Sequence, residues 1–375
     1  MGKHAILSAS SSHRWLACPP SARLCEGIED KGSEYAQQGT DAHSLCEHKL
    51  RNALGLETTD PTGHLAYYDS EMEDCATEYA GYVMSLVAAV KQTCKDPVVL
   101  IEQRLDFSRY VESGFGTGDC VIVADGTLYI IDYKHGTGVE VSAENNPQMM
   151  LYALGALELF DALYDIDIVH MTIFQPRRSN VSEYAMNKDI LLRWATEELM
   201  PKAKLAYEGG GEFQAGEHCR FCKVKATCRK RAEYNLELAQ YDFEMPATLD
   251  EVEIAAVLTK ADELAAWAAD VKEYALQQAL CGTAYPGFKV VEGCSNRKYT
   301  DETQVAEAVK AAGKNPFSEP EVLGITAMTK LLGGKKKFDE ILGNLVYKPQ
   351  GKPVLVPESD KRKPMNTAQD DFKDN

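Results

Sequence analysis

Two acids and a lysine interrupt an apolar stretch near the middle of the chain. Asp119 precedes one apolar run, and Asp132 and Lys134 come at the end of the next. Alternate side chains of a β-strand point to the same face, so Asp132 and Lys134 are expected to lie side by side. Charged groups in an apolar segment need partners if they are buried. A divalent metal ion and a phosphate group would supply both, so this segment is a candidate site for phosphate chemistry.

The segments around these residues alternate between expected strands and helices. Asp125-Gly126 is a strong signal for a two-residue hairpin, so the two apolar runs are expected to pair. A helix after the hairpin would place Gln148 and Tyr152 on one face, because they are four residues apart. The pattern predicts strands at 98–107, 119–123, 127–133, 139–141 and 166–175, and helices at 35–54, 71–95, 148–160 and 189–208.

Three further polar residues on these elements have more than one interpretation. His43 lies in the helix expected at 35–54, where a single histidine is more often a core or surface residue than a ligand. Glu47 shares its helix face and is expected on the helix surface or behind the ligands. Glu102, inside an apolar strand, is either an acid that supports the metal site or a plain surface residue.

A cluster of cysteines predicts a second site. Cys219, Cys222 and Cys228 form the pattern C-x2-C-x5-C in a chain with eleven cysteines and no recognisable secretory signal. That context favours free or metal-binding thiols over disulfides. Three thiols can reach one ion or cluster, and a fourth ligand is needed. The candidates are His218, which would give a zinc site of the Cys3His type, or a remote cysteine.

The composition limits the class of protein. The chain has 375 residues and a formal net charge of −17, and no apolar run approaches the roughly 20 residues that span a bilayer. We expect a cytoplasmic protein without membrane contact, and the acidic balance argues against non-specific coating of DNA. A domain is expected at 1–244, followed at 245–375 by a mainly helical region with a mobile tail. The second region is expected to contain helices at 248–280 and 301–312 and a strand at 287–297.

Together these residues resemble the core of PD-(D/E)XK nucleases of the RecB/AddB type. That family carries G-x3-H on an early helix, an acid before one strand, an acid-x-lysine at the end of the next and Q-x3-Y on the following helix. The matching residues here are Gly39 with His43, Asp119, Asp132-Tyr133-Lys134, and Gln148 with Tyr152. The acid before the lysine is Asp here rather than the commoner Glu, which shortens its reach to a metal.

The resemblance implies an α/β, restriction-endonuclease-like core with a mixed central sheet flanked by helices. Its implied ligands for one or two Mg2+ or Mn2+ ions are His43, Asp119, Asp132 and the backbone carbonyl of Tyr133. Lys134 would orient or help to deprotonate the attacking water, or stabilise charge on the phosphate. Gln148 and Tyr152 would position the phosphate or the lysine through hydrogen bonds.

The cysteines fit the same resemblance. Iron–sulfur members of that family carry one cysteine before the nuclease core and three after it. The matching residues are Cys18, Cys219, Cys222 and Cys228. The resemblance therefore implies a [4Fe-4S] cluster that clips the two ends of the domain together, and it favours Cys18 over His218 as the fourth ligand. Structural Zn2+ is the alternative.

The whole chain, including its tail, also resembles an uncharacterised phage-encoded family. The expected function is that of a metal-dependent DNA nuclease, an exonuclease on single strands or duplex ends, in phage DNA recombination, replication or processing in the host cytoplasm. Expected partners are DNA and a phage recombinase, single-strand-binding protein or helicase. The alternative is a protein of the same fold that binds DNA or a recombinase without cutting.

Overall fold

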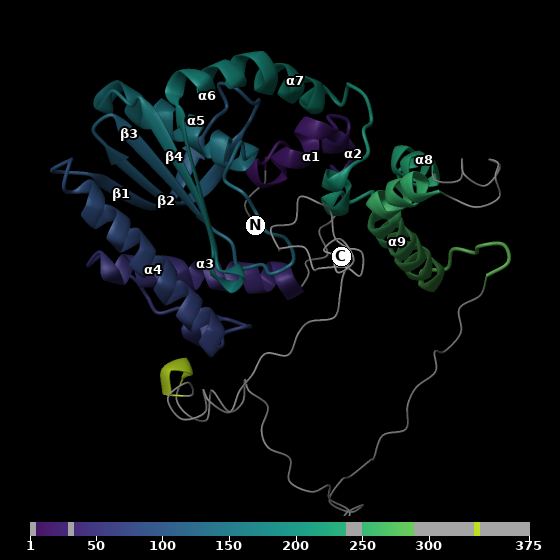
Figure 1. Ribbon diagram of the computed structural model, residues 1–375, viewed down its shortest axis with the longest axis horizontal. Helices are drawn as coiled ribbons and strands as arrows, with labels where there is room; N and C mark the ends of the chain where they lie inside the picture. The colour runs from purple at the N-terminus through teal and green to yellow at the C-terminus, as the bar shows by residue number, and fades with distance from the viewer. Residues whose placement is uncertain (1–4, 29–33, 238–249, 289–333, 338–375) are drawn as a thin grey trace, which may run out of the picture. The chain divides into compact units, whose positions relative to one another are not determined.

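A computed structural model describes residues 5–28, 34–237, 250–288 and 334–337 (Figure 1). Contacts within the chain group residues 1–275 in one unit and residues 276–375 in another. The first unit contains a five-stranded mixed sheet flanked by helices. Its strands are β1 (Val98–Asp106), β2 (Phe115–Ala124), β3 (Thr127–Tyr133), β4 (Ile168–Gln175) and β5 (Asn180–Asn187). The helices are α1 (Ser12–Ala17), α2 (Ser21–Leu24), α3 (Glu34–Ala53), α4 (Ser70–Val90), α5 (Pro147–Tyr164), α6 (Lys188–Trp194), α7 (Met200–Glu208), α8 (Arg229–Leu236) and α9 (Glu251–Leu280), the last of which continues beyond the first unit.

The strands follow one another in the sheet in the order β1-β2-β3-β4-β5. β1, β2 and β3 pair antiparallel, and the predicted turn at Asp125-Gly126 is confirmed, with Ala124 opposite Thr127. β3 and β4 are parallel, which requires a crossover connection, and α5 provides it. β5 returns antiparallel to β4. The mixed central sheet flanked by helices, as expected from the sequence, is therefore confirmed.

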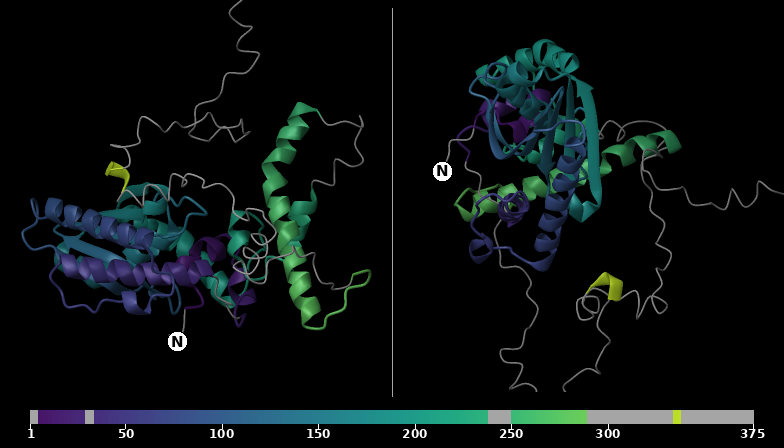
Figure 2. Two further views of the ribbon diagram at one scale, coloured as in Figure 1. Left: turned by 90° about the horizontal axis from the view of Figure 1, so that it is seen from below. Right: turned by 90° about the vertical axis from the view of Figure 1, so that its left-hand side faces the viewer.

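Side chains on the strands alternate between two cores. On β2, Val121 and Val123 belong to the core that includes α5, whereas Cys120 and Ile122 belong to the core formed with α3 and α4. Figures 1 and 2 show α3 and α4 on one face of the sheet and α5 to α7 on the other. The alternation is interrupted at Asp119, because a Cβ on Gly118 would also face the α5 core, against Leu105 and Val121, whereas Asp119 contacts His43 of α3.

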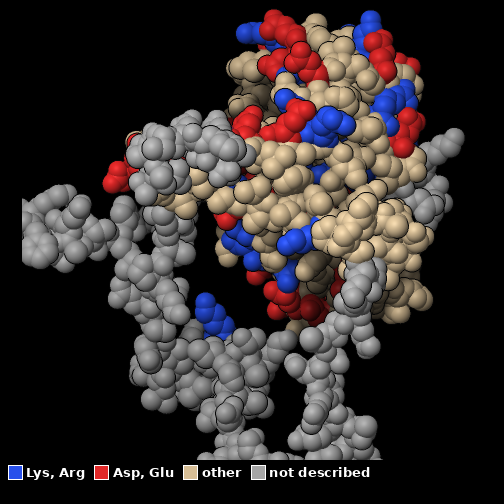
Figure 3. Space-filling view, turned by 90° about the vertical axis from the view of Figure 1, so that its right-hand side faces the viewer, with Lys and Arg blue, Asp and Glu red and all other residues tan. Residues whose placement is uncertain are grey.

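Two further observations concern the hydropathy of the helices and the charges of the surface. No helix among the described residues is long and apolar enough to cross a membrane. On the face that Figure 3 shows, Lys and Arg side chains of the described residues are interspersed with Asp and Glu.

Three elements differ from the sequence predictions. Residues 139–141 are not a strand, because the side-chain amide of Gln175 replaces a neighbouring strand as their partner. It accepts from Val141 N at 3.2 Å and donates to Val139 O at 2.8 Å. β5 was not predicted, because its polar composition hides the alternation of its side chains. The helix expected at 189–208 is interrupted by a π-helical turn at 195–199 between α6 and α7.

Most predictions for the C-terminal region lie outside the described residues. These are the boundary between residues 244 and 245, the helix at 301–312, nearly all of the strand at 287–297, and the mobile tail. The helix expected at 248–280 is confirmed as α9. The division of the chain into regions 1–244 and 245–375 stays a prediction.

Candidate functional site

The pairing of the edge strand β1 with β2 brings two acids together. The register places Glu102 opposite Asp119. His43, from α3, reaches the same point, and its Nδ1 lies 3.1 Å from Asp119 Oδ1. One potential ligand atom from each of these three residues lies within 4.8 Å of the other two. Two carboxylate oxygens and an imidazole nitrogen at this spacing suit a divalent cation, and the nitrogen favours Mn2+ over Mg2+.

Glu102 has an unusual backbone conformation. Its φ is +51°, in the left-handed region, although it lies in the middle of a strand. Such a conformation costs a non-glycine residue about 1–3 kcal/mol and concentrates at functional sites, where the surrounding structure enforces it. The strain coincides with the carboxylate that faces Asp119. It supports the first of the two interpretations of Glu102, an acid at the metal site, and the signal in the sequence was an acid inside an apolar strand.

A hydrogen-bonded network joins the hairpin to α5. Lys134 Nζ lies 2.9 Å from Asp132 Oδ2 and donates to Gln148 Oε1 at 3.2 Å. The Gln148 amide nitrogen lies within hydrogen-bond distance of Asp132 Oδ1, at 3.2 Å, and of the Tyr152 hydroxyl, at 3.1 Å. An amide can bridge these groups because it carries both an acceptor and two donors. The acid-x-lysine and Q-x3-Y motifs of the sequence are therefore in direct contact.

Local sequence determines where α5 begins and how closely it approaches the sheet. Asn146 caps the helix by accepting a hydrogen bond from Gln148 N at 3.0 Å, and Pro147 occupies its first position. Gly116 on β2 leaves space for the ring of Tyr152, since a Cβ at that position would lie 2.6 Å from Tyr152 Cε1. The Asn146 cap and the absence of a side chain at Gly116 together position Gln148 and Tyr152.

Charge pairing and burial shift the pKa values of His43, Asp119 and Glu102. Burial lowers the pKa of His43, but the adjacent Asp119 carboxylate outweighs burial and raises it to about 9. Burial raises the pKa of Asp119, yet His43 and the N–H of Tyr133 hold it below its ordinary value. Burial, reinforced by repulsion from Asp119, raises the pKa of Glu102 to about 7. A bound cation would stabilise the two carboxylates in their charged form.

In the neighbouring pair of Asp132 and Lys134, the Asp132 side chain is buried and the Lys134 side chain is partly exposed. Burial raises the pKa of Asp132, and the charge of Lys134 compensates only in part. Burial lowers the pKa of Lys134, but the Asp132 carboxylate outweighs it and raises the pKa above its ordinary value. Lys134 is therefore protonated at neutral pH and acts as a donor. Asp132 Oδ2 has an ion-pair contact but no aligned hydrogen-bond donor, which leaves it able to accept a further partner such as a cation.

The structure brings the predicted metal ligands together only in part. Asp132 lies outside the 4.8 Å group that contains the other two predicted side chains. Tyr133 contacts the group through its backbone N–H, which donates to Asp119 Oδ2 at 2.6 Å, and its carbonyl as a ligand stays a prediction. Glu47 pairs with Arg51 across one helical turn at 2.8 Å, as expected of a residue on the helix surface.

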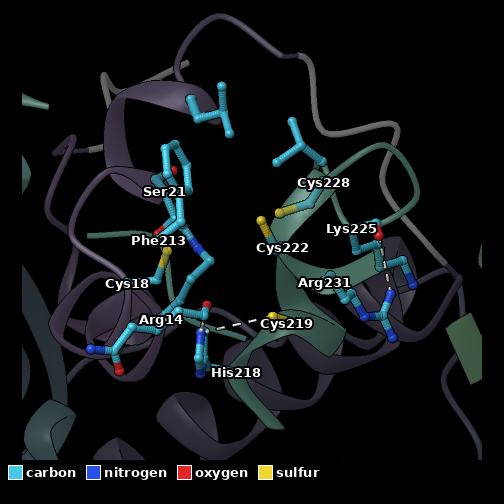
Figure 4. Close-up of a pocket in the computed structure, with 13 residues that line it drawn as sticks. Arg14, Cys18, Ser21, Phe213, His218, Cys219, Cys222, Lys225, Cys228 and Arg231 are labelled. Carbon is cyan, nitrogen blue, oxygen red and sulfur yellow. Dashed lines mark hydrogen bonds between the residues drawn. The ribbon is translucent and has the colours of Figure 1, made fainter. Parts of the chain in front are cut away.

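Cysteines from opposite ends of the first unit line one pocket (Figure 4). Cys18 follows α1, Cys219 lies in a 3-10 turn at 217–221, and Cys222 and Cys228 follow that turn. All four cysteines of the predicted cluster are therefore neighbours, although the sequence separates the first from the rest by about 200 positions.

Basic side chains surround the same pocket. Arg14, Lys225 and Arg231 line it, and Arg231 is 2% exposed. Arg231 Nη1 and Lys225 Nζ lie 2.6 Å and 2.7 Å from the two carboxylate oxygens of Asp270 on α9. Positive charge beside thiols stabilises thiolates, the form in which cysteine binds metals.

The spacing of the ligand atoms bears on the choice between zinc and a cluster. Ligands of one tetrahedral zinc ion, each about 2.3 Å from it, stand about 3.8 Å from one another. Among the described residues of this pocket, no three cysteine or histidine ligand atoms lie mutually within 4.8 Å. His218 Nε2 is also engaged, at 3.0 Å from Gln214 O. A cluster and a zinc ion therefore stay the two alternatives for this pocket.

A fifth cysteine, which the sequence analysis did not identify, adjoins this pocket. Cys25 Sγ lies 3.7 Å from Cys222 Sγ, and both side chains are buried. Cys25 lies immediately after α2, seven positions beyond Cys18. The only signal in the sequence was its presence on the same N-terminal segment as Cys18.

A comparison with known families assigns the chain. A family model described as "Protein of unknown function (DUF2800)" matches residues 4–363. The chain belongs to this family. Among solved structures, the chain is similar to one described as "Crystal structure of SSO0001", with 11% identity over 59% of this chain and 96% of that one and a TM-score of 0.21. A likeness at that level carries no argument about function.

Proposed function

We propose that this DUF2800 protein is a divalent-metal-dependent DNA nuclease with a PD-(D/E)XK core, an exonuclease acting on single strands or duplex ends. The observation that supports it most is the convergence of four separate motifs. His43 and Asp119 contact each other, and Asp132, Lys134, Gln148 and Tyr152 form one network beside them. An acidic cation site next to a charged lysine is the combination that phosphodiester hydrolysis needs.

The donor set fits a hard divalent cation. The side chains of His43, Glu102 and Asp119 would hold Mg2+ or Mn2+. Asp132 Oδ2 is buried without a hydrogen-bond donor, so it could contact the same cation. A bound cation of this kind supplies charge neutralisation at a phosphate and activation of water. Glu102 thus joins the ligands that the resemblance to the nuclease family implies.

Lys134 has the role of an electrostatic partner for the phosphate. Its raised pKa keeps it protonated, so it donates and does not accept a proton at neutral pH. Asp132 and Gln148 hold its ammonium group from two sides, at 2.9 Å and 3.2 Å. Of the roles considered for this lysine, stabilising charge on the scissile phosphate or orienting water uses the ammonium group that Asp132 and Gln148 hold in place.

The cysteine pocket is proposed to hold a [4Fe-4S] cluster. Cys18, Cys219, Cys222 and Cys228 would be its ligands, because all four line the pocket and, among its described residues, no three cysteine or histidine ligand atoms lie mutually within 4.8 Å. The cluster would join the N-terminal segment to the segment after α7 and so close the domain. The context in phage DNA processing, with a recombinase, single-strand-binding protein or helicase as partner, is part of the same proposal.

A nuclease assay with purified full-length protein tests the activity. Single-stranded and duplex DNA, labelled at either end, is incubated with Mg2+ or Mn2+, and the products of the wild type are compared with those of Lys134→Ala. We expect cleavage to fall by about 10^2–10^3-fold, the range for the loss of one preorganised charge-stabilising group. The matched control is Lys202→Ala, whose lysine pairs with Glu198 on the exposed surface of α7.

The assay also separates the two functions considered from the sequence. Equal cleavage by the wild type and Lys134→Ala would remove catalysis from this site. Tight DNA binding by the wild type without cleavage in any divalent metal would favour the non-cleaving DNA- or recombinase-binding protein.

A further inference from the structure

We propose that Cys25 and Cys222 form a disulfide when the cysteine pocket holds no cluster. Their sulfurs are 3.7 Å apart, in a hydrogen-bonding contact that joins residues 197 positions apart in the chain. A disulfide requires about 2.05 Å between the sulfurs, so the two sulfurs must approach each other further for the bond to form. The inference rests on the proposed function only in taking Cys222 as a cluster ligand.

The partner choice follows from what surrounds the other sulfurs. Cys18 is hydrogen-bonded with His218, and Cys219 Sγ lies 3.8 Å from the same imidazole. Among the described residues, Cys25 and Cys222 are the two cysteines in direct sulfur–sulfur hydrogen-bonding contact. If Cys222 is oxidised in this pocket, the thiol of Cys25 is therefore already next to it.

The oxidation is balanced with a peroxide as oxidant. One sulfur attacks hydrogen peroxide, the O–O bond breaks, and a sulfenic acid and water are formed. The second sulfur attacks the sulfenic sulfur, an S–S bond forms, and a second water leaves. Two thiols and one peroxide thus give one disulfide and two waters. The small size of peroxide matters, because Cys25 and Cys222 are only 6% and 8% exposed.

The disulfide would replace the cluster as the link between the ends of the domain. Cys222 cannot bind iron while it is bonded to Cys25, so the two states exclude each other. Both states connect the segment around α2 with the turn that carries Cys219 and Cys222. The covalent link would therefore keep the domain closed after cluster loss, and a reductant would return the thiols for reassembly.

The test uses full-length protein in two states, cluster-loaded under anaerobic conditions and metal-free after chelation under reductant. Each sample is freed of reductant, treated with hydrogen peroxide, blocked at its free thiols and digested without reduction. We expect the metal-free sample to lose two free thiols and about 2 Da, and to yield one peptide pair linking Cys25 and Cys222. The cluster-loaded sample should keep both thiols until its absorbance is lost.

Two variants complete the experiment. Cys25→Ser should abolish the linked peptide, whereas Cys94→Ser, at a buried cysteine of the other core, should leave it unchanged. A metal-free wild type that links Cys222 to another cysteine, or that is oxidised without a link, would overturn the proposal. An equal yield of the link in loaded protein would do so as well. None of these readouts depends on nuclease activity, so their failure and that of the proposed function are distinguishable.

Discussion

The acidic site and the cysteine pocket have different kinds of structural support. In the acidic site, strand register and a capped helix position the side chains, and hydrogen bonds connect hairpin residues such as Asp132 to α5. In the pocket, short turns and helix ends carry the cysteines, and one sulfur–sulfur contact connects the two ends of the domain. Regular structure can hold polar groups in place without a ligand, whereas loops need a ligand to hold them.

This difference predicts how each site responds to damage. Changes in the cysteine pocket should affect the stability of the whole first unit, because the ligand there joins distant segments. Changes in the acidic site should alter metal response and activity with smaller effects on folding. Substitutions at Cys228, Gly116, Glu102 and His43 test this contrast.

Cys228→Ser should give the largest loss. The cluster would lack one ligand, and we expect iron and broad absorbance near 400 nm to disappear. The free energy of unfolding should fall by about 4–5 kcal/mol, comparable with the chain entropy that a cross-link across 100 residues removes. Iron content and anaerobic chemical denaturation measure both effects. The control is Cys281→Ser, at an exposed cysteine, and unchanged iron and stability in Cys228→Ser would contradict the proposed ligand set.

Gly116→Ala should disturb the acidic site by displacing one ring. The new Cβ would lie 2.6 Å from Tyr152 Cε1, so the tyrosine must move and its hydrogen bond with Gln148 is strained. We expect a cost of about 1–3 kcal/mol in stability and a reduced rate of cleavage. Gly63→Ala is the control, since no atom lies within 4 Å of its added Cβ. A wild-type rate in Gly116→Ala would show that the ring position does not matter.

Glu102→Gln should stabilise the metal-free protein while weakening its response to metal. The substitution removes a carboxylate whose charged form is disfavoured by burial and by repulsion from Asp119, so the free energy of unfolding in chelator should rise by about 1 kcal/mol at pH 8, allowing for solvent screening. The rise in melting temperature on adding Mn2+ should shrink. Glu112→Gln, on an exposed loop, serves as the control. A wild-type response to Mn2+ would remove Glu102 from the ligand set.

The smallest expected effect is a pH dependence that comes from His43. Its pKa is about 9 in the folded protein and 6.5 in the unfolded chain, so the folded state binds the proton more tightly. The resulting stability is fully present below pH 6.5 and is lost as the pH rises toward 9. Because this side chain is 34% exposed, we expect at most about 1 kcal/mol. Melting curves in chelator across this range should flatten in His43→Gln, and an unchanged slope would contradict the pairing with Asp119.

The sequence was most informative where local rules suffice. The Asp125-Gly126 turn and, in the described part of the chain, most of the helices and strands follow from turn chemistry and periodicity, and the structure confirms them. The unpredicted strand β5 and the irregular segment 139–141 depend on partners far along the chain, such as Gln175. Local patterns contain no information about such partners.

For the site, the sequence indicated which residues could take part, but not all of the contacts between them. Alternation along a strand predicted that Asp132 and Lys134 share a face, and the helical period predicted the same for Gln148 and Tyr152. The sequence alone could not decide between the two interpretations of Glu102. Only the β1–β2 register and its left-handed backbone set it opposite Asp119. Cys25 meets Cys222 only because folding brings together segments almost 200 residues apart. The sequence by itself thus determined the chemical groups and the local elements that carry them, and the tertiary structure decided which groups meet, because contacts between distant segments depend on packing and not on local spacing.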